Sequence, residues 1–129
     1  MQITLLMNDM EIKETKIARI EVNKSKFISI LMPLENVDDF KPLLENIKKE
    51  YPKAKHYVYA YRVGNISKSC DDREPKGTAG RPLLELLHKK DINNAALVVV
   101  RYYGGTNLGA SRLLRTYVSS GVEVIKLFE

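Results

Sequence analysis

A glycine-rich stretch that follows an apolar run is the part of the sequence best suited to bind a ligand. Residues 98–109 read Val-Val-Val-Arg-Tyr-Tyr-Gly-Gly-Thr-Asn-Leu-Gly, which predicts a buried strand, a turn and the start of a helix. Glycine lets backbone N–H groups approach an anion, and a helix N-terminus adds partial positive charge, so a phosphate of a nucleotide or of RNA would suit this corner. A tight strand–helix corner explains the glycines equally well, and the spacing matches no mononucleotide-binding fingerprint.

A second polar stretch, residues 71–82, is predicted to be a loop that leads into a helix. Three of its first four residues are carboxylates, which supply the oxygen ligands that Mg²⁺ or Ca²⁺ prefers. Basic residues interleaved with them neutralise the cluster, and the spacing differs from that of an EF-hand. We therefore favour a structural role, in which Thr78 caps the helix and glycines bend the chain. The motif residues of this loop are Asp71, Asp72, Glu74, Gly77, Thr78 and Gly80.

Tyr57, Tyr59 and Tyr61 alternate within a predicted strand and therefore lie on one face of a sheet. On the surface, beside lysines, they would form a stacking platform for single-stranded RNA. We favour the alternative that they pack beneath a helix with their hydroxyl groups toward solvent. The reason is that aromatic residues make up only 8% of the chain and are needed to fill its interior.

Histidine and cysteine are too few for several kinds of site. The chain contains only His56, His88 and Cys70 of these types. This excludes an internal disulfide and a metal site that needs several His or Cys ligands, and no serine or cysteine lies where it would complete a catalytic triad. We expect no cofactor and no metal, and we expect a reducing, cytoplasmic location.

Hydrophobic periodicity predicts the elements that position these residues. Alternating or continuous apolar runs predict strands at residues 3–7, 15–22, 26–32, 57–63, 66–70 and 95–100. Apolar residues at three- and four-residue spacing predict helices at residues 37–51, from Pro82 onward, and at 110–128, the first of them capped by Asp38 or Asp39. This order predicts an α+β fold, an α/β two-layer sandwich, as one domain over residues 1–129.

Charge is distributed unevenly along the chain of 129 residues, whose net charge is +5. Residues 1–51 hold 8 Lys and Arg against 9 Asp and Glu, whereas residues 52–129 hold 13 against 7. A basic second part suits a surface that faces nucleic acid, although mixed surface charge that maintains solubility is the more general explanation. No apolar run approaches the roughly 18 residues that a membrane span needs, so we expect no membrane partner.

Taken together, these stretches resemble the Impact family, also called the YigZ or UPF0029 family. The matching residues are Lys-Ser-Lys-Phe at 24–27, His56, the stretches 71–82 and 98–109, and Arg-Thr-Tyr at 115–117. The resemblance implies a fold like the second domain of the small-subunit ribosomal protein S-five, with a four-stranded sheet backed by helices. The chain departs from the family pattern where relatives commonly have glycine, at Arg73, Ser111 and Arg112.

The resemblance also implies a role in translation without established catalysis. Eukaryotic members compete for the activator of a starvation-responsive kinase through an extra N-terminal domain, and bacterial members usually add a C-terminal ferredoxin-like domain. We find neither addition in this sequence and interpret residues 1–129 as the shared domain alone.

We therefore expect a non-enzymatic cytoplasmic regulator linked to translation that binds RNA or a ribosome-associated surface, with a regulatory protein as a second expected partner. This function requires the stretches 71–82 and 98–109 to lie side by side in the folded chain and form one basic site. The alternatives are a metal-dependent enzyme acting on a phosphorylated small molecule or nucleotide, and a protein-interaction module that uses its sheet face. The predicted nucleic-acid or anion-binding residues are Lys24, Lys26, His56, Arg81, Arg101, Tyr102, Tyr103, Gly104, Gly105, Gly109, Arg112 and Arg115.

Overall fold

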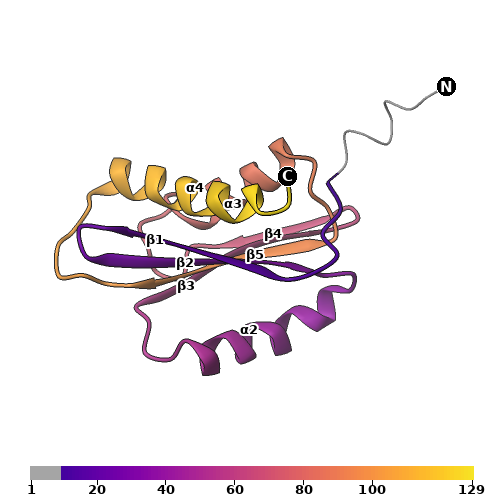
Figure 1. Cartoon of the computed structure of the whole chain (residues 1–129), viewed down its shortest axis with the longest axis horizontal. Helices are drawn as coiled ribbons and strands as arrows, with labels where there is room; N and C mark the ends of the chain where they lie inside the picture. The colour runs from indigo at the N-terminus through magenta and orange to yellow at the C-terminus, as the bar shows by residue number, and fades with distance from the viewer. Residues whose placement is uncertain (1–9) are drawn as a thin grey trace.

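The computed structural model describes residues 10–129 and shows an antiparallel five-stranded sheet flanked by helices (Figure 1). The strand order is β1-β2-β5-β3-β4. This confirms the α+β fold class, and the strand predicted at residues 3–7 lies outside the described residues. The elements are β1 (Lys16–Val22), β2 (Ser25–Pro33), the 3-10 helix η1 (Val37–Asp39), α2 (Phe40–Glu50), β3 (His56–Val63), β4 (Ile66–Cys70), α3 (Gly80–Lys89), β5 (Ala95–Tyr102) and α4 (Ala110–Lys126).

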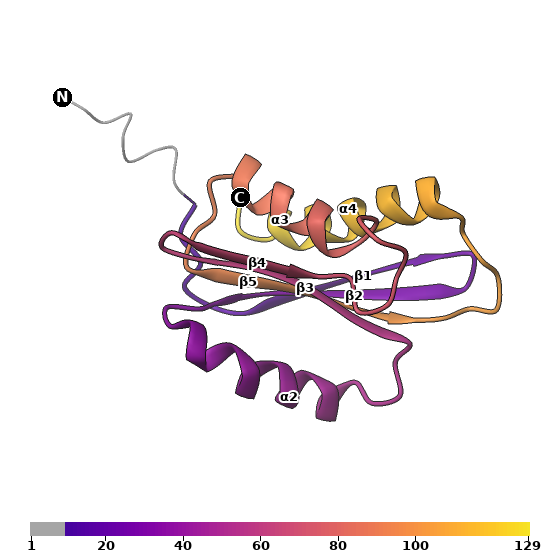
Figure 2. The same ribbon diagram turned by 180° about the vertical axis from the view of Figure 1, so that it is seen from behind.

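The helices form two layers, one on each face of the sheet. Helices α3 and α4 cover one face and α2 covers the other, as Figures 1 and 2 show from opposite sides. The expected four strands and two layers are therefore corrected to five strands and three layers. The physical reason lies in the central strand β5, which is buried from Ala95 to Arg101. A strand that is buried on both faces needs a covering layer on both.

Strand alternation divides the apolar side chains between two cores. Val58 and Ala60 of β3 are buried in the core beneath α3 and α4. Tyr59 and Tyr61 of the same strand face α2, where the Phe40 ring centroid lies 4.6 and 4.9 Å from theirs. Tyr61 is buried, and Tyr57 and Tyr59 are partly buried against the same core, so the three tyrosines pack beneath a helix as the favoured alternative predicts.

The predicted elements within the described residues correspond to observed ones, with small shifts at their ends. The predicted strand 95–100 continues through Tyr102, and the predicted helix 37–51 begins as η1 before it becomes α2. Asn36, rather than Asp38 or Asp39, provides the cap there, because its Oδ1 accepts the Asp38 N–H at 2.9 Å. Among the described residues, no helix is long and apolar enough to cross a membrane.

The start of α3 also differs from its prediction. The Asp71 carboxylate, rather than Thr78, caps this helix, and the Thr78 hydroxyl instead donates to the Pro75 carbonyl at 2.5 Å. Sequence distance hid this cap, because a capping side chain is expected beside the helix and not at the far end of a loop. The N–H groups that Asp71 accepts, at 2.9, 3.2 and 2.7 Å, belong to Gly77, Ala79 and Gly80.

Candidate nucleic-acid interface

One end of the sheet gathers loops that are far apart in the sequence. The register pairs Lys26 with Tyr102 and His56 with Arg101, so β2 and β3 begin where β5 ends. This end lies at the left of Figure 1. The two stretches singled out in the sequence, 71–82 and 98–109, meet here. The loops at this end are residues 23–24, 51–55, 71–79 and 103–109.

Beneath these loops lies a buried ionic cluster. Arg101 Nη1 donates to both carboxylate oxygens of Glu74, at 3.0 and 2.8 Å, and the Tyr117 hydroxyl donates to Glu74 Oε2 at 2.5 Å. His56 Nε2 lies 3.4 Å from Glu74 Oε1. Buried ions are stable only when they are paired and hydrogen-bonded, so Arg101 and Glu74 hold each other in place. Through Arg101 and Tyr117, Glu74 fastens the loop 71–79 onto β5 and α4.

Apolar and aromatic groups surround this cluster. The Tyr117 ring meets the Phe27 ring edge to face at 5.3 Å, and Arg101 Cζ lies 5.4 Å from the Phe27 ring centroid. Burial raises the pKa of the Tyr117 hydroxyl, and the adjacent Glu74 carboxylate raises it further. Tyr117 therefore acts as a neutral hydrogen-bond donor to Glu74. Within residues 10–129, Arg101 Nε has no hydrogen-bond partner.

His56 and Ser25 extend the cluster to the starts of two more strands. The His56 Nδ1 atom lies 2.6 Å from the Asp72 carbonyl oxygen, which can only accept, so Nδ1 donates. Ser25 Oγ lies 3.4 Å from Arg101 Nη2 and accepts the Gly104 N–H at 3.1 Å. The cluster is thereby connected to the glycine-rich loop.

These contacts correct the prediction for Arg101 and His56 as anion-contacting residues. The two residues are only 5% and 7% exposed, and their polar atoms bind the protein itself. The sequence could not show this, because the partner of Arg101 lies 27 residues away. Both residues position loops of this end of the sheet from below.

The carboxylates of the loop 71–79 are likewise occupied by the protein. Asp71 caps α3, Asp72 Oδ2 accepts the Tyr57 N–H at 2.6 Å, and Glu74 pairs with Arg101. Among the described residues, no group of three or more His, Cys, Asp or Glu is placed to hold a metal ion. The hydrogen bonds of these carboxylates agree with the structural role that the sequence analysis favoured for this loop.

The three glycines of the predicted corner have different environments. Gly104 packs on the backbone of Lys24 and Ser25 so closely that a Cβ atom would overlap them. The absence of a side chain at Gly104 therefore lets the turn between β1 and β2 pack against it, and does not serve the approach of a ligand. Gly105 and Gly109 have φ values of +93° and +82°, which favour glycine. Within the described chain, no atom beyond the glycine and its two chain neighbours lies within 4 Å of a Cβ placed on either, so both face open space.

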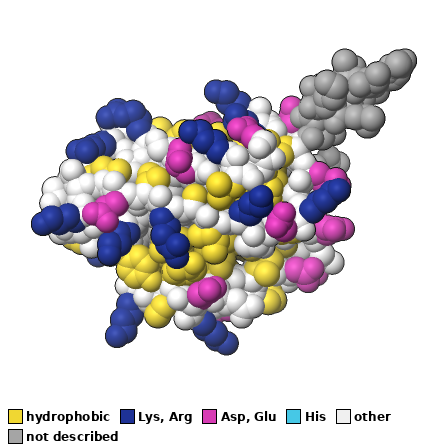
Figure 3. Space-filling view, viewed as in Figure 1, with side chains coloured by type: hydrophobic (Ala, Val, Ile, Leu, Met, Phe, Trp, Pro, Cys, Tyr) yellow, Lys and Arg dark blue, Asp and Glu magenta, His cyan; other side chains and the backbone are white. Residues whose placement is uncertain are grey.

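Exposed basic side chains surround this end of the sheet, which we call the basic end. Figure 3 shows Lys and Arg side chains around the left end of the molecule, with fewer Asp and Glu. Arg112 Nη2 donates to Asn23 Oδ1 at 3.4 Å and Arg115 Nη1 to Ser111 Oγ at 2.6 Å, both neutral acceptors. The basic end comprises Lys24, Lys26, Lys53, Lys55, Arg73, Lys76, Arg112 and Arg115.

The structure thus adds basic residues that the sequence analysis did not include. They precede β3 or lie in the loop 71–79, and only the strand register brings them to the same end as the glycine-rich loop. The excess of basic residues over 52–129 was the sequence signal that pointed to them. The added residues are Lys53, Lys55, Arg73 and Lys76.

Three other predicted residues have contrasting environments. Arg81 is exposed, but its Nε lies 3.7 Å from Glu85 Oε2 one helical turn along α3. Tyr102 is half-buried in the core beneath α2, and its hydroxyl donates to the Pro52 carbonyl at 3.0 Å. Tyr103 is 45% exposed, so it is the tyrosine of this corner that faces solvent.

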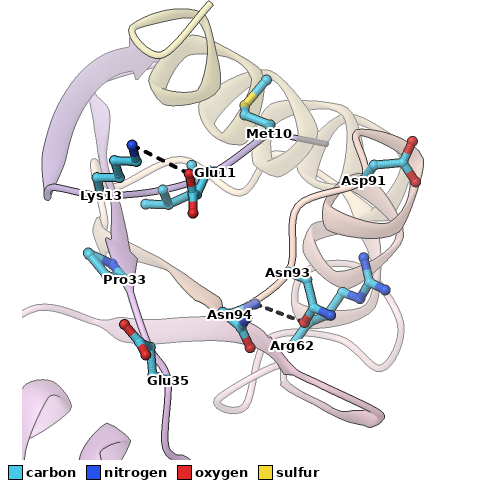
Figure 4. Close-up of a pocket in the computed structure, with 10 residues that line it drawn as sticks. Met10, Glu11, Lys13, Pro33, Glu35, Arg62, Asp91, Asn93 and Asn94 are labelled. Atoms are coloured by element: carbon cyan, nitrogen blue, oxygen red, sulfur yellow. Dashed lines mark hydrogen bonds and ion pairs between the residues drawn. The ribbon is translucent and has the colours of Figure 1, made fainter. Parts of the chain in front are cut away.

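A cavity of about 800 Å³ lies at the opposite end of the molecule. Figure 4 shows its wall, formed by residues 10–13, the end of β2, Arg62 and the segment before β5. Arg62 Nη1 donates to the Ile92 carbonyl at 2.9 Å, and Lys13 pairs with Glu11 at 3.5 Å. None of the predicted site residues lines this cavity.

The fold defines the chain as an α+β domain with one antiparallel sheet between helical layers. The Impact N-terminal domain family matches residues 23–125, and the chain belongs to this family. An IMPACT family member of Haemophilus influenzae is 39% identical over 114 residues, which cover 84% of this chain and 55% of that protein. The IMPACT family member YvyE of Bacillus subtilis is 39% identical over 124 residues, 92% of this chain and 57% of that protein.

A solved structure has the same fold. A crystal structure of a hypothetical protein superposes with a TM-score of 0.87 at 31% identity, over 92% of this chain and 60% of that chain. The chain spans about half the length of the curated relatives it matches.

Proposed function

We propose that this chain is a non-enzymatic regulator linked to translation, which acts in the cytoplasm by binding RNA, free or exposed on a ribosome, through the basic end. The observation that carries the proposal is the convergence of exposed cations at one end of the sheet, from three loops, the start of β2 and the first turns of α4. Neutralisation of phosphates by Lys and Arg supplies most of the sequence-independent affinity of proteins for nucleic acid.

The local geometry of α4 supports phosphate binding at this end. Arg112 and Arg115 contact neutral oxygens, so those contacts leave their charges uncompensated. The N-cap residue of α4 is Gly109, which in the described chain supplies no side-chain cap. The first N–H groups of a helix attract anions, and the helix dipole adds to the charge of the arginines.

The link to translation rests on the family. The resemblance to the Impact family implies a role in translation, and this chain contains the Impact N-terminal domain over residues 23–125. The chain spans about half the length of the bacterial relatives. The link to translation is therefore proposed for the shared domain and not transferred from the activities of whole family members.

The two rival functions have weaker support. A metal-dependent enzyme would need carboxylates that are free to bind a cation, whereas Asp71, Asp72 and Glu74 serve backbone groups and Arg101. An interaction module that uses its sheet face would need an uncovered face, whereas helices lie over both (Figure 1).

Titration of fluorescently labelled RNA with the purified chain at several salt concentrations tests the proposal. The triple variant Lys24→Gln, Arg112→Gln and Arg115→Gln should bind more weakly, and its salt slope should flatten by about 0.7 for each phosphate that it no longer neutralises. The matched control Lys13→Gln, Lys41→Gln and Lys89→Gln removes the same charge from exposed lysines elsewhere on the molecule. Absence of binding at low salt, or equal weakening in both variants, would show that the proposal is wrong.

A further inference from the structure

Tyr103 is a large aromatic side chain that the fold leaves exposed within the basic end. It lies one residue past the end of β5 and is 45% exposed. Its hydroxyl donates to Asn107 Oδ1 at 3.2 Å, which ties the ring to its own loop. The neighbouring Tyr102 is half-buried in the core beneath α2. Tyr103 is therefore the aromatic ring of the corner that a ligand can reach.

Two cations lie against this ring. Arg101 Cζ is 5.8 Å and Lys55 Nζ is 6.0 Å from the ring centroid. Arg101 is itself buried and is held by Glu74 at 2.8 Å, so it supports the ring from the protein side. Lys55 is exposed at the end of a flexible stem. The ring thus lies near a buried guanidinium that the protein holds in place and near an exposed ammonium group, and part of it is open to solvent.

We propose that Tyr103 stacks on an unpaired base of single-stranded RNA whose phosphates lie along the cations of the basic end. The inference rests on the proposed function and adds that the bound RNA is single-stranded. Bases of a duplex already stack on one another, whereas unpaired bases can leave the strand and stack on an aromatic ring. Every base has a π-face, so this contact selects single strands without selecting a sequence.

The chain contains no tryptophan, which makes a direct measurement feasible. Tyr103→Trp places one indole at the proposed contact, and base stacking should quench its fluorescence. The probes are a single-stranded RNA of about 12 nucleotides, within the range of site sizes of single-strand-binding domains, its duplex, and an abasic strand of the same length. We expect quenching by the single strand, and weak or no quenching by the duplex and the abasic strand at equal bound fraction.

Affinity measurements on Tyr103→Ala and Tyr103→Phe complete the test. Tyr103→Ala should bind the single strand roughly 5- to 150-fold more weakly, the range for removal of one stacked base, with an unchanged salt slope. Tyr103→Phe should bind like the unsubstituted chain, because it keeps the ring and removes only the bond to Asn107. Circular dichroism establishes that each variant is folded.

The outcomes separate the two proposals. If Tyr103→Ala binds single strands normally while the Lys24, Arg112 and Arg115 triple variant binds weakly, stacking is wrong and phosphate binding stands. Equal quenching by single strand and duplex would overturn the inference in the same way. If the unsubstituted chain binds none of the probes at low salt, the proposed function fails and the stacking inference fails with it.

Discussion

Glu74 shows how one buried side chain can hold several segments of a small domain together. Its carboxylate accepts from Arg101 at the end of β5 and from Tyr117 in α4, and it lies beside His56 at the start of β3. A carboxylate that is only 7% exposed depends on these partners, because a buried charge without them is costly. The loops of the basic end are therefore positioned by a side chain that is buried beneath them.

Breaking this pair should cost more stability than removing it. Glu74→Ala leaves the Arg101 guanidinium buried and unpaired, so we expect a decrease of about 3–5 kcal/mol in the free energy of unfolding. The double variant Glu74→Leu and Arg101→Met removes both charges and should be less destabilised than Glu74→Ala alone. Urea unfolding at neutral pH measures both. A decrease below about 1 kcal/mol for Glu74→Ala would contradict a buried, interdependent pair.

Helix α3 shows that the start of an element can depend on a residue far outside it. The Asp71 carboxylate accepts N–H groups at 2.7–3.2 Å from the first turn of α3 and the loop before it. These donors would otherwise lack partners at a partly buried helix start. One side chain thereby closes the loop 71–79 and orients Glu74 within it.

Replacement of this cap should destabilise the protein measurably. We expect Asp71→Ala to lower the free energy of unfolding by about 1–2 kcal/mol, because it removes a charged acceptor of several backbone donors. Asp39→Ala is the matched control, because Asp39 is the N-cap residue of α2 and makes no side-chain cap bond in the described structure. Thermal or urea unfolding compares the two. Equal destabilisation would show that Asp71 has no special capping role.

At the scale of the whole molecule, the sheet separates two cores, and the side chains of β3 contribute to both. The core on the α2 side is partly aromatic, and the Phe40 ring packs against Tyr59 and Tyr61. This arrangement buries phenol groups. Burial raises the pKa of Tyr59 to about 12, and the nearby Cys70 adds to the effect.

The stability of the molecule should therefore fall in alkaline solution. The folded state favours the neutral Tyr59 phenol, so its contribution is complete below the unfolded value near pH 10 and disappears as pH rises through about 12. We expect the free energy of unfolding to decline over this range, and more slowly in Tyr59→Phe. Tyr103→Phe, at an exposed site, is the control. Identical declines in all three proteins would contradict the prediction.

Hydrophobic periodicity alone predicted most of the architecture. The alternation of β3, the continuous apolar run of β5 and the stripe of α4 are local patterns that follow from backbone geometry. Even the division of β3 between tyrosines and small apolar residues could be predicted. The number of layers was harder to predict, because it depends on which faces of the assembled sheet need cover.

The environment of each charged residue was decided only by the tertiary structure. Arg101 and Arg112 are both arginines of the same sequence region, yet one is buried against Glu74 and the other is exposed. An ion pair over 27 residues and a cap over 9 residues leave no periodic signal, because they depend on how separate segments meet. The sequence by itself therefore determined the elements and their apolar faces. The tertiary structure decided which polar groups bind each other and which remain for a ligand.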